Sequence, residues 1–391
     1  MSHPVPKEGD AFIPLVRPSF GDEEYAAVKN CLTSGWVTTG PSVAAFEQAL
    51  KDYFKAPYVL ALSSNTAGLY LSLRALSVGP GDEVITTPLT FAATANVIEM
   101  TGATTVFCDI NPLTRNICLK ALAQKITPKT RAILPVHMYG LPLEMEKLYK
   151  IAEAFDVRII EDAAQAMGAR DAGKKIGSLG DTQVFSFHAN KNITTCEGGC
   201  LVTRDEALFQ KVKSLHFHGF DRPAWDRFQK KGKGDYDIVA PGLKFNMTDL
   251  QAAIGLCQLK KMNTFQEKRT ALAMRYLNAF EDCPYLEMPP QHQGHCWHLF
   301  SPLVHFDRIK LSRSELMMQL KERNIGTGIH YKPLHHFSYY AKKYAHKEGV
   351  FPHTEKIGHS TISLPLFPAL TFSQQDYVIQ QLKILLEKYC K

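Results

Sequence analysis

The chain has 391 residues, of which 45% are hydrophobic and 21% are charged, as in an ordinary globular enzyme with one large and one smaller domain. Its formal net charge of +7 is too small and too evenly spread for a nucleic-acid-binding protein. Nine scattered cysteines, with no CxxC pair, favour a cytoplasmic protein over a disulfide-bonded one. We expect no secretory signal and no membrane span, because no segment reaches about 18 apolar residues.

The first two-thirds of the chain alternates short apolar runs with segments of helical length. Runs rich in Val, Ile and Phe without polar alternation are typical of strands buried on both faces. We predict strands at residues 58–62, 83–87, 104–108, 131–136, 157–160, 183–187 and 200–203. We predict helices at residues 67–76, 92–100, 145–155 and 207–215. This alternation predicts an α/β fold with a seven-stranded, mostly parallel sheet between two layers of helices.

The pattern changes near residue 249. Residues 249–280 predict one long amphipathic helix or two in succession, capped at 247–249. The later predicted elements are a strand-like run at 298–305 and helices at 313–323 and 373–388. We therefore predict a large α/β domain over residues 1–250 and a smaller α+β domain over 251–391. The basic segment 221–237 is predicted to form an exposed flap.

The strongest chemical pattern pairs Asp162 with Lys191. Each follows a predicted strand, so both lie at strand ends, where open parallel sheets bind ligands. Pyridoxal phosphate requires a lysine that forms a Schiff base and an acid that faces the ring nitrogen. The same lysine, once free, can move the substrate proton. The alternative interpretation is a surface lysine and a helix-capping aspartate.

Other residues fit the same cofactor. Residues 63–66 (SSNT) precede a predicted helix whose N-terminal N–H groups could bind a phosphate, although such residues also cap helices without any ligand. Ser186 could add a hydroxyl to the phosphate, or be an ordinary polar strand end. Phe91 follows the strand at 83–87, and its ring could stack on the pyridine or belong to the core.

Together these elements resemble the DegT/DnrJ/EryC1/StrS group of nucleotide-sugar aminotransferases, which share the fold-type I architecture of pyridoxal-phosphate enzymes. The resemblance covers nearly the whole chain. It includes SSNTAGLYLSL (63–73), EDAAQAMGA (161–169), SFHANKNITTCEGG (186–199) and FNMTDLQAAIGLCQL (245–259). One difference of detail is Cys196, where the group often has a small residue before EGG; cysteine is small enough to fit.

The resemblance implies roles for individual residues. It assigns the Schiff base with pyridoxal 5'-phosphate to Lys191. The implied cofactor contacts are Asp162 at the ring nitrogen, Gln165 near the ring oxygen, Asn65, Thr66 and Ser186 at the phosphate, and Phe91 on the ring. Asn246 is implied to reach the cofactor phosphate in the neighbouring subunit. The resemblance therefore also implies a homodimer with shared active sites. The implied contacts with the nucleotide-diphosphate sugar are Trp36, Thr39, His188, His330 and His335.

The implied activity is transfer of an amino group from glutamate to C4 of a nucleotide-linked 4-keto sugar, for cell-surface glycan or lipid A modification. Segments 215–227 and 240–249 are most similar to the branch that makes UDP-4-amino-4-deoxy-L-arabinose, whose relatives act on 4-keto-6-deoxyhexoses. Two alternatives are a dehydratase, in which histidine replaces the lysine, and a non-catalytic protein of the same fold. None of the histidine spacings is a zinc signature, so no metal site is predicted.

Overall fold

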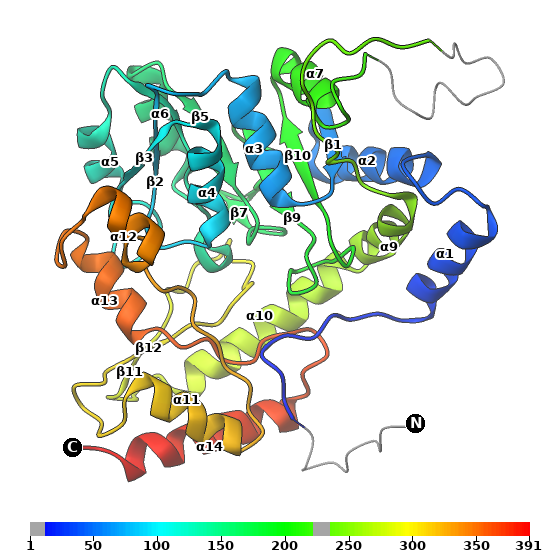
Figure 1. The fold of residues 1–391 in the computed structure, drawn as a ribbon. Coiled ribbons are helices and arrows are strands. Elements are labelled where there is room, and N and C mark those ends of the chain that lie inside the picture. Colours follow the sequence, from blue (N-terminus) through cyan, green and yellow to red (C-terminus); the bar gives the residue numbers. More distant parts are fainter. Residues whose placement is uncertain (1–11, 222–234) are drawn as a thin grey trace.

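The structure of the protein is a computed structural model in which residues 12–221 and 235–391 are described. Strands and helices alternate through its first part, as predicted (Figure 1). The strands of the central sheet are β1 (Tyr58–Leu62), β2 (Glu83–Thr86), β3 (Thr104–Phe107), β4 (Thr130–Ile133), β5 (Arg158–Ile159), β6 (Glu161–Asp162), β9 (Thr182–Ser186) and β10 (Gly199–Thr203). They fall on the predicted apolar runs, and β6 carries the run at 157–160 on to Asp162.

Two four-stranded ladders make up this sheet, ordered β3-β2-β4-β5 and β1-β10-β9-β6. They join because only Ile160 separates β5 from β6, and its N–H donates to the carbonyl of Ile133 (3.0 Å). The N–H of Asp162 likewise donates to the carbonyl of Pro135 (2.8 Å). In the described residues the sheet therefore has seven strands, and only β10 runs antiparallel to its neighbours. The predicted seven-stranded, mostly parallel sheet is confirmed.

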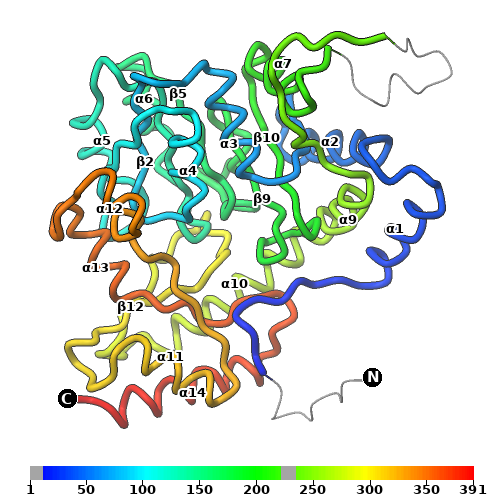
Figure 2. The backbone as a smooth tube through the Cα atoms, in the orientation of Figure 1, coloured from blue at the N-terminus to red at the C-terminus, as the bar shows by residue number. Residues whose placement is uncertain are grey.

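Helices cover both faces of the sheet, because alternate residues of a strand point to opposite sides. Phe185 faces one cluster of buried side chains and Val184 faces another. The helices on the Phe185 side are α2 (Pro41–Phe54), α5 (Leu119–Lys125) and α6 (Met145–Ala154). The helices on the Val184 side are α3 (Asn65–Ala75), α4 (Ala92–Thr101) and α7 (Glu206–Leu215). The strands are thus enclosed between two helical layers (Figure 2).

The last part of the chain packs around a separate cluster of buried residues, which includes Leu272, Leu316 and Leu382. The helices that contribute to this cluster are α10 (Met262–Ala279), α11 (Arg313–Glu322) and α14 (Phe372–Lys388). The other helices of this part of the chain are α9 (Asp249–Lys260), η2 (Leu334–His336), α12 (Ser338–Tyr344) and α13 (Pro352–Ser360). The remaining elements of the first part of the chain are α1 (Asp22–Thr33), η1 (Met138–Gly140), β7 (Arg170–Asp171) and β8 (Lys174–Lys175). Among the described helices, none is both long and apolar enough to cross a lipid bilayer.

The strand predicted at 298–305 is mostly wrong. Only Leu303–Val304 (β12) forms a ladder, and it pairs with Leu286–Glu287 (β11). Pro302 has no N–H to donate to a neighbouring strand, which explains why the apolar run does not continue as a ladder.

The domain boundary placed between residues 250 and 251 stays a prediction. α9 packs against α1 and α2. Further along, α10 begins in the Phe185 cluster with Phe265 and ends in the C-terminal cluster with Leu272. One continuous helix therefore contacts both cores.

Asp249 connects the start of α9 to the start of α2. Its carboxylate accepts hydrogen bonds from the N–H groups of Gly40 (2.8 Å), Ser42 (3.1 Å) and Val43 (3.0 Å). These are the donors that an α-helix leaves unpaired at its N-terminus. A negative charge at this end also interacts favourably with the helix dipole.

We expect Asp249→Ala to lower the free energy of unfolding by about 2–4 kcal/mol, because it leaves several buried N–H groups without an acceptor. Thermal or denaturant unfolding measures this loss. Ser312→Ala, which removes the exposed cap of α11, is the matched control and should cost only about 1 kcal/mol. An equal loss in the two variants would contradict the role of Asp249.

Candidate active site

A pocket of about 280 Å³ lies beyond the carboxyl ends of β6 and β9, where an open parallel sheet binds ligands. Most of the residues predicted for the site line it. These are Asn65, Thr66, Phe91, Asp162, Gln165, Ser186, His188, Lys191 and His330. A larger groove, of about 470 Å³ between Arg170 and Trp297, contains none of the predicted residues.

Asp162 lies in the wall of the pocket and is only 4% exposed. The Asn65 amide (3.2 Å) and the Ala164 N–H (3.1 Å) donate to one carboxylate oxygen, and the Thr94 hydroxyl (2.8 Å) donates to the other. Burial raises the pKa of the Asp162 carboxyl, whereas these donors and Lys191 act to lower it. A buried carboxylate of this kind is stabilised by a positive charge brought next to it.

Lys191 lies in the loop after β9. Burial lowers the pKa of its amine to about 8, and the Asp162 carboxylate opposes that shift. Asn192, the next residue, anchors this loop, because its buried side-chain amide donates to the carbonyls of Met167 (3.1 Å) and Cys296 (3.1 Å). Lys191 lines the pocket, and Asp162 accepts hydrogen bonds from the Asn65 and Thr94 side chains, which disfavours the alternatives of a surface lysine and an aspartate that only caps a helix.

The N-terminus of α3 forms another wall. Ser64 caps it, accepting a hydrogen bond from the N–H of Ala67 (3.1 Å). The Asn65 side chain turns away from the helix end and donates to Asp162 and to the carbonyl of Val184 (2.7 Å). The groups left for an anion are thus the backbone N–H groups of the first turn together with Thr66 and Ser186.

Phe91 is 61% exposed, so the alternative that it belongs to the core is wrong. Its ring lies 6.2 Å from that of Tyr331, and both line the pocket. The Tyr331 hydroxyl accepts a hydrogen bond from the Gln165 amide (3.0 Å), and Gln165 in turn accepts from the N–H of Tyr139 (2.7 Å). Thr94 and Tyr331 were not predicted as site residues, because their contacts with Asp162 and Gln165 join segments that are far apart in the sequence.

Two histidines lie at the pocket, in different surroundings. His188 is exposed, and its Nδ1 lies 2.9 Å from the side-chain oxygen of Asn190. His330 is partly buried, and burial together with Lys191 lowers its pKa to about 4. Near neutral pH His330 is therefore an uncharged hydrogen-bonding group facing the pocket.

Four predicted site residues do not line this pocket. Trp36, Thr39 and Asn246 lie together elsewhere: the Asn246 amide donates to the Thr39 hydroxyl (2.6 Å), and the Trp36 indole donates to the Thr39 carbonyl (3.0 Å). His335 is buried beside Glu355. The basic residues of the predicted flap, Arg222, Arg227, Lys230 and Lys231, lie outside the described residues.

Known proteins have similar sequences and folds. The DegT/DnrJ/EryC1/StrS aminotransferase family matches residues 18–383. The chain belongs to this family.

Individual relatives match over almost their whole length. The spore coat polysaccharide biosynthesis protein SpsC of Bacillus subtilis is 42% identical over 375 residues, which are 95% of this chain and 96% of SpsC. The PMP form of Spr1654 from Streptococcus pneumoniae, described as a sugar aminotransferase, has a TM-score of 0.89 at 32% identity, covering 96% and 99% of the two chains. Helicobacter pylori PseC, an aminotransferase of pseudoaminic acid biosynthesis, has a TM-score of 0.89 at 30% identity, covering 97% and 100%.

The pocket fits pyridoxal phosphate, the cofactor of this aminotransferase. It brings together a buried carboxylate, an amine with a lowered pKa and a helix N-terminus, which suit a pyridinium, a carbonyl carbon and a phosphate respectively. An aromatic ring is exposed at the same pocket. These four requirements are met by residues from separate parts of the chain.

Proposed function

We propose that this protein transfers an amino group from L-glutamate to C4 of a nucleotide-linked 4-keto sugar. The observation that carries this proposal is that Lys191 and Asp162 line one pocket at the sheet edge. When bound, pyridoxal phosphate withdraws electrons from the substrate carbon whose C–H bond breaks. Family membership supports transfer of an amino group over the two alternatives, elimination and loss of catalysis.

Each residue of the pocket has a distinct task in this proposal. Lys191 holds the cofactor through its amine and, once released, carries a proton to and from the substrate carbon. Asp162 keeps the ring nitrogen protonated through its negative charge. The first turn of α3, with Thr66 and Ser186, binds the phosphate. Phe91 covers the cofactor ring, and Gln165 orients the oxygen substituent of that ring.

The proposed acceptor is a UDP-4-keto-pentose or a 4-keto-6-deoxyhexose. The similarity of segments 215–227 and 240–249 to the arabinose branch supports the first. SpsC takes part in polysaccharide biosynthesis and PseC in pseudoaminic acid biosynthesis, which supports a role in cell-surface glycan or lipid A modification. The free cysteines of the chain support a cytoplasmic location.

The test is to incubate the purified protein with glutamate and each keto sugar, and to analyse the products by mass spectrometry. We expect one amino sugar and one 2-oxoglutarate for each keto sugar and glutamate consumed. A dehydrated sugar formed without an amino donor would instead establish elimination. A protein that binds no cofactor would establish the non-catalytic alternative.

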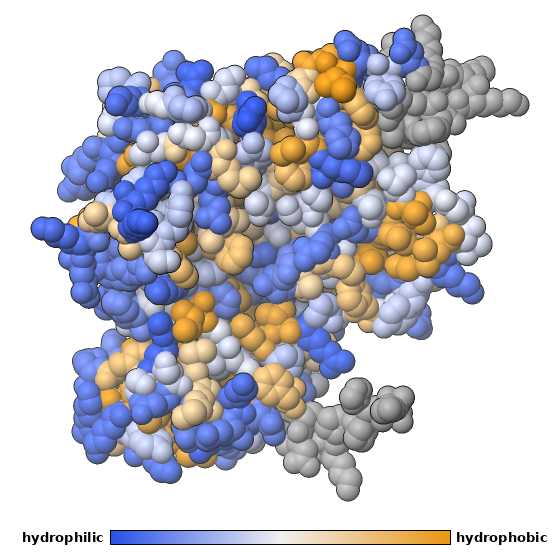
Figure 3. Space-filling view, in the orientation of Figure 1, coloured by the Kyte–Doolittle hydropathy of each residue, from blue (hydrophilic) through white to orange (hydrophobic). Residues whose placement is uncertain are grey.

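We further propose a homodimer in which Asn246 of each subunit completes the site of the other. Asn246 lies outside the pocket of its own chain, next to Thr39. Val37, two residues before Thr39, is 41% exposed, and Leu32, in the last turn of α1, is 56% exposed. Figure 3 shows hydrophobic residues gathered on the face around α1 and α9, which suits burial against a second copy.

Mixed dimers test this sharing. One subunit carries Lys191→Ala and the other carries Asn246→Ala, with different affinity tags for purification. If the sites are shared, one of the two contains both changes and the other contains neither, so about half of the wild-type activity is expected. If each site belongs to one chain, both sites are damaged and activity stays near that of the single variants.

The lowered pKa of Lys191 predicts how cofactor attachment depends on pH. Only the neutral amine attacks a carbonyl, so the attachment rate of cofactor-free protein should rise with pH through a midpoint near 8. The reaction can be followed by stopped-flow absorbance, with a free lysine derivative in parallel to correct for titration of the cofactor. Asp162→Asn should move the midpoint lower, because the carboxylate raises the pKa of the amine. A midpoint near 10.5 would contradict the lowered pKa of Lys191.

A further inference from the structure

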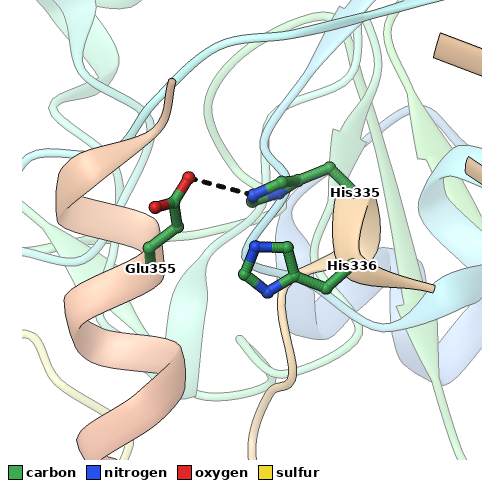
Figure 4. A group of neighbouring side chains, drawn as sticks. All are labelled: His335, His336 and Glu355. Atoms are coloured by element: carbon green, nitrogen blue, oxygen red, sulfur yellow. Dashed lines mark hydrogen bonds and ion pairs between the residues drawn. The ribbon is translucent and has the colours of Figure 1, made fainter. Parts of the chain in front are cut away.

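His335, His336 and Glu355 form a cluster outside the proposed active site. The two histidines end the short helix η2, and Glu355 lies in the first turn of α13 (Figure 4). One nitrogen of each histidine and one carboxylate oxygen all lie within 4.8 Å of one another. Among the described residues this is the one group of at least three such side chains with this spacing.

We propose that this His335–His336–Glu355 cluster binds a zinc ion. Two imidazoles and one carboxylate are a ligand set that Zn²⁺ accepts, with water in the fourth position. Mg²⁺ and Ca²⁺ prefer oxygen ligands, so the two imidazoles disfavour them. The proposal does not depend on the aminotransferase reaction.

The spacing of the ligand atoms is close to what zinc requires. With bonds of about 2.0–2.1 Å, the ligand atoms of a tetrahedral site lie about 3.4 Å apart. Nε2 of His335 and Oε1 of Glu355 are already 3.2 Å apart. His336 is only partly buried, so a rotation of its side chain can close the remaining gap. The same exposure gives an ion a path to the cluster.

The surroundings also support a binding site. The Glu355 carboxylate is fixed by the N–H groups of Gly349 (2.7 Å) and Phe351 (3.2 Å), as the carboxylate ligands of metal sites commonly are.

A bound ion would brace one wall of the proposed active site. The segment that enters η2 begins with His330 and Tyr331, which line that pocket. It is also held at Leu334, whose N–H donates to the carbonyl of Pro88 (2.8 Å). Zinc would tie the end of this segment to α13. We therefore expect it to stabilise the fold instead of taking part in the reaction.

The test uses tag-free holoenzyme that is stripped with a chelator, loaded with Zn²⁺, desalted and analysed by mass spectrometry. We expect about one zinc per chain in the wild type. In His336→Ala the zinc affinity should fall by at least about 100-fold. The matched control is His353→Ala, which removes an exposed histidine from α13, the helix that carries Glu355. This variant should bind zinc like the wild type. Glu355→Gln gives a second variant if His336→Ala is unstable.

Cobalt gives a spectroscopic readout that a cluster without metal-binding ability would not produce. Co²⁺ bound to nitrogen and oxygen ligands should give visible bands in the wild type and in His353→Ala, but not in His336→Ala. Removing zinc should lower the thermal midpoint of the wild type and leave that of His336→Ala unchanged. The proposal fails if the wild type binds no zinc, or if His336→Ala binds it equally well.

Discussion

Replacing Lys191 with alanine is expected to lower kcat for amino transfer by about 10⁴-fold or more. The variant lacks the amine that holds the cofactor and also moves the substrate proton. Burial keeps the pKa of this amine near 8, so near neutral pH it can both donate and accept a proton, as an acid–base catalyst must. The measurement is kcat with glutamate and a keto sugar, together with the visible absorption spectrum of the purified protein. The band of lysine-linked cofactor should disappear.

The matched control is Lys174→Ala, which removes an exposed lysine from β8 and should leave kcat and the spectrum unchanged. Thermal unfolding of both variants separates loss of the amine from loss of the fold. A Lys191→Ala protein that retained the absorption band and most of its activity would contradict the assignment of this residue. Another amine would then have to hold the cofactor.

The sheet could be predicted from the sequence because its strands are buried on both faces. Residues 58–62 (YVLAL) are apolar throughout and residues 183–187 (QVFSF) are mostly apolar, without the regular polar alternation of a strand that has one face in solvent. The position of Lys191 and Asp162 follows from the same reasoning, since parallel strands end at a common edge. Local pattern and topology thus place both residues at one edge, whereas the resemblance to the aminotransferase family assigned their roles.

Contacts between distant segments could not be predicted in this way. Thr94 donates to Asp162 across 68 positions of the chain, and Gln165 donates to Tyr331 across 166. Neither pair has a local signature, because each depends on how a helix or loop is placed on the sheet. The His335–Glu355 pair has the same character: the sequence shows adjacent histidines, but the carboxylate comes from another helix, 20 positions away.

The second large effect is expected at Asp162. Asp162→Asn should lower kcat by about 10³-fold, because the variant keeps the shape of the side chain but loses the charge that faces the ring nitrogen. Without that charge the ring nitrogen loses its proton more easily, and the cofactor withdraws electrons less well. The measurement is kcat, with cofactor content determined after acid release. Full cofactor content with reduced kcat is expected; an unchanged kcat would show that the charge is not needed.

Thr94→Val separates the charge of Asp162 from its hydrogen bonds. The Thr94 hydroxyl donates to the carboxylate and so helps to lower its pKa. Without this hydrogen bond the pKa of Asp162 should rise, so the carboxylate becomes protonated at a higher pH than in the wild type. We expect kcat to fall by only about 10-fold at neutral pH, and the acidic limb of the pH profile to move upward. Asp162→Asn has no carboxylate left to titrate, so its profile should lack that limb. A shared limb in the two variants would mean that another group controls the acid side of the reaction.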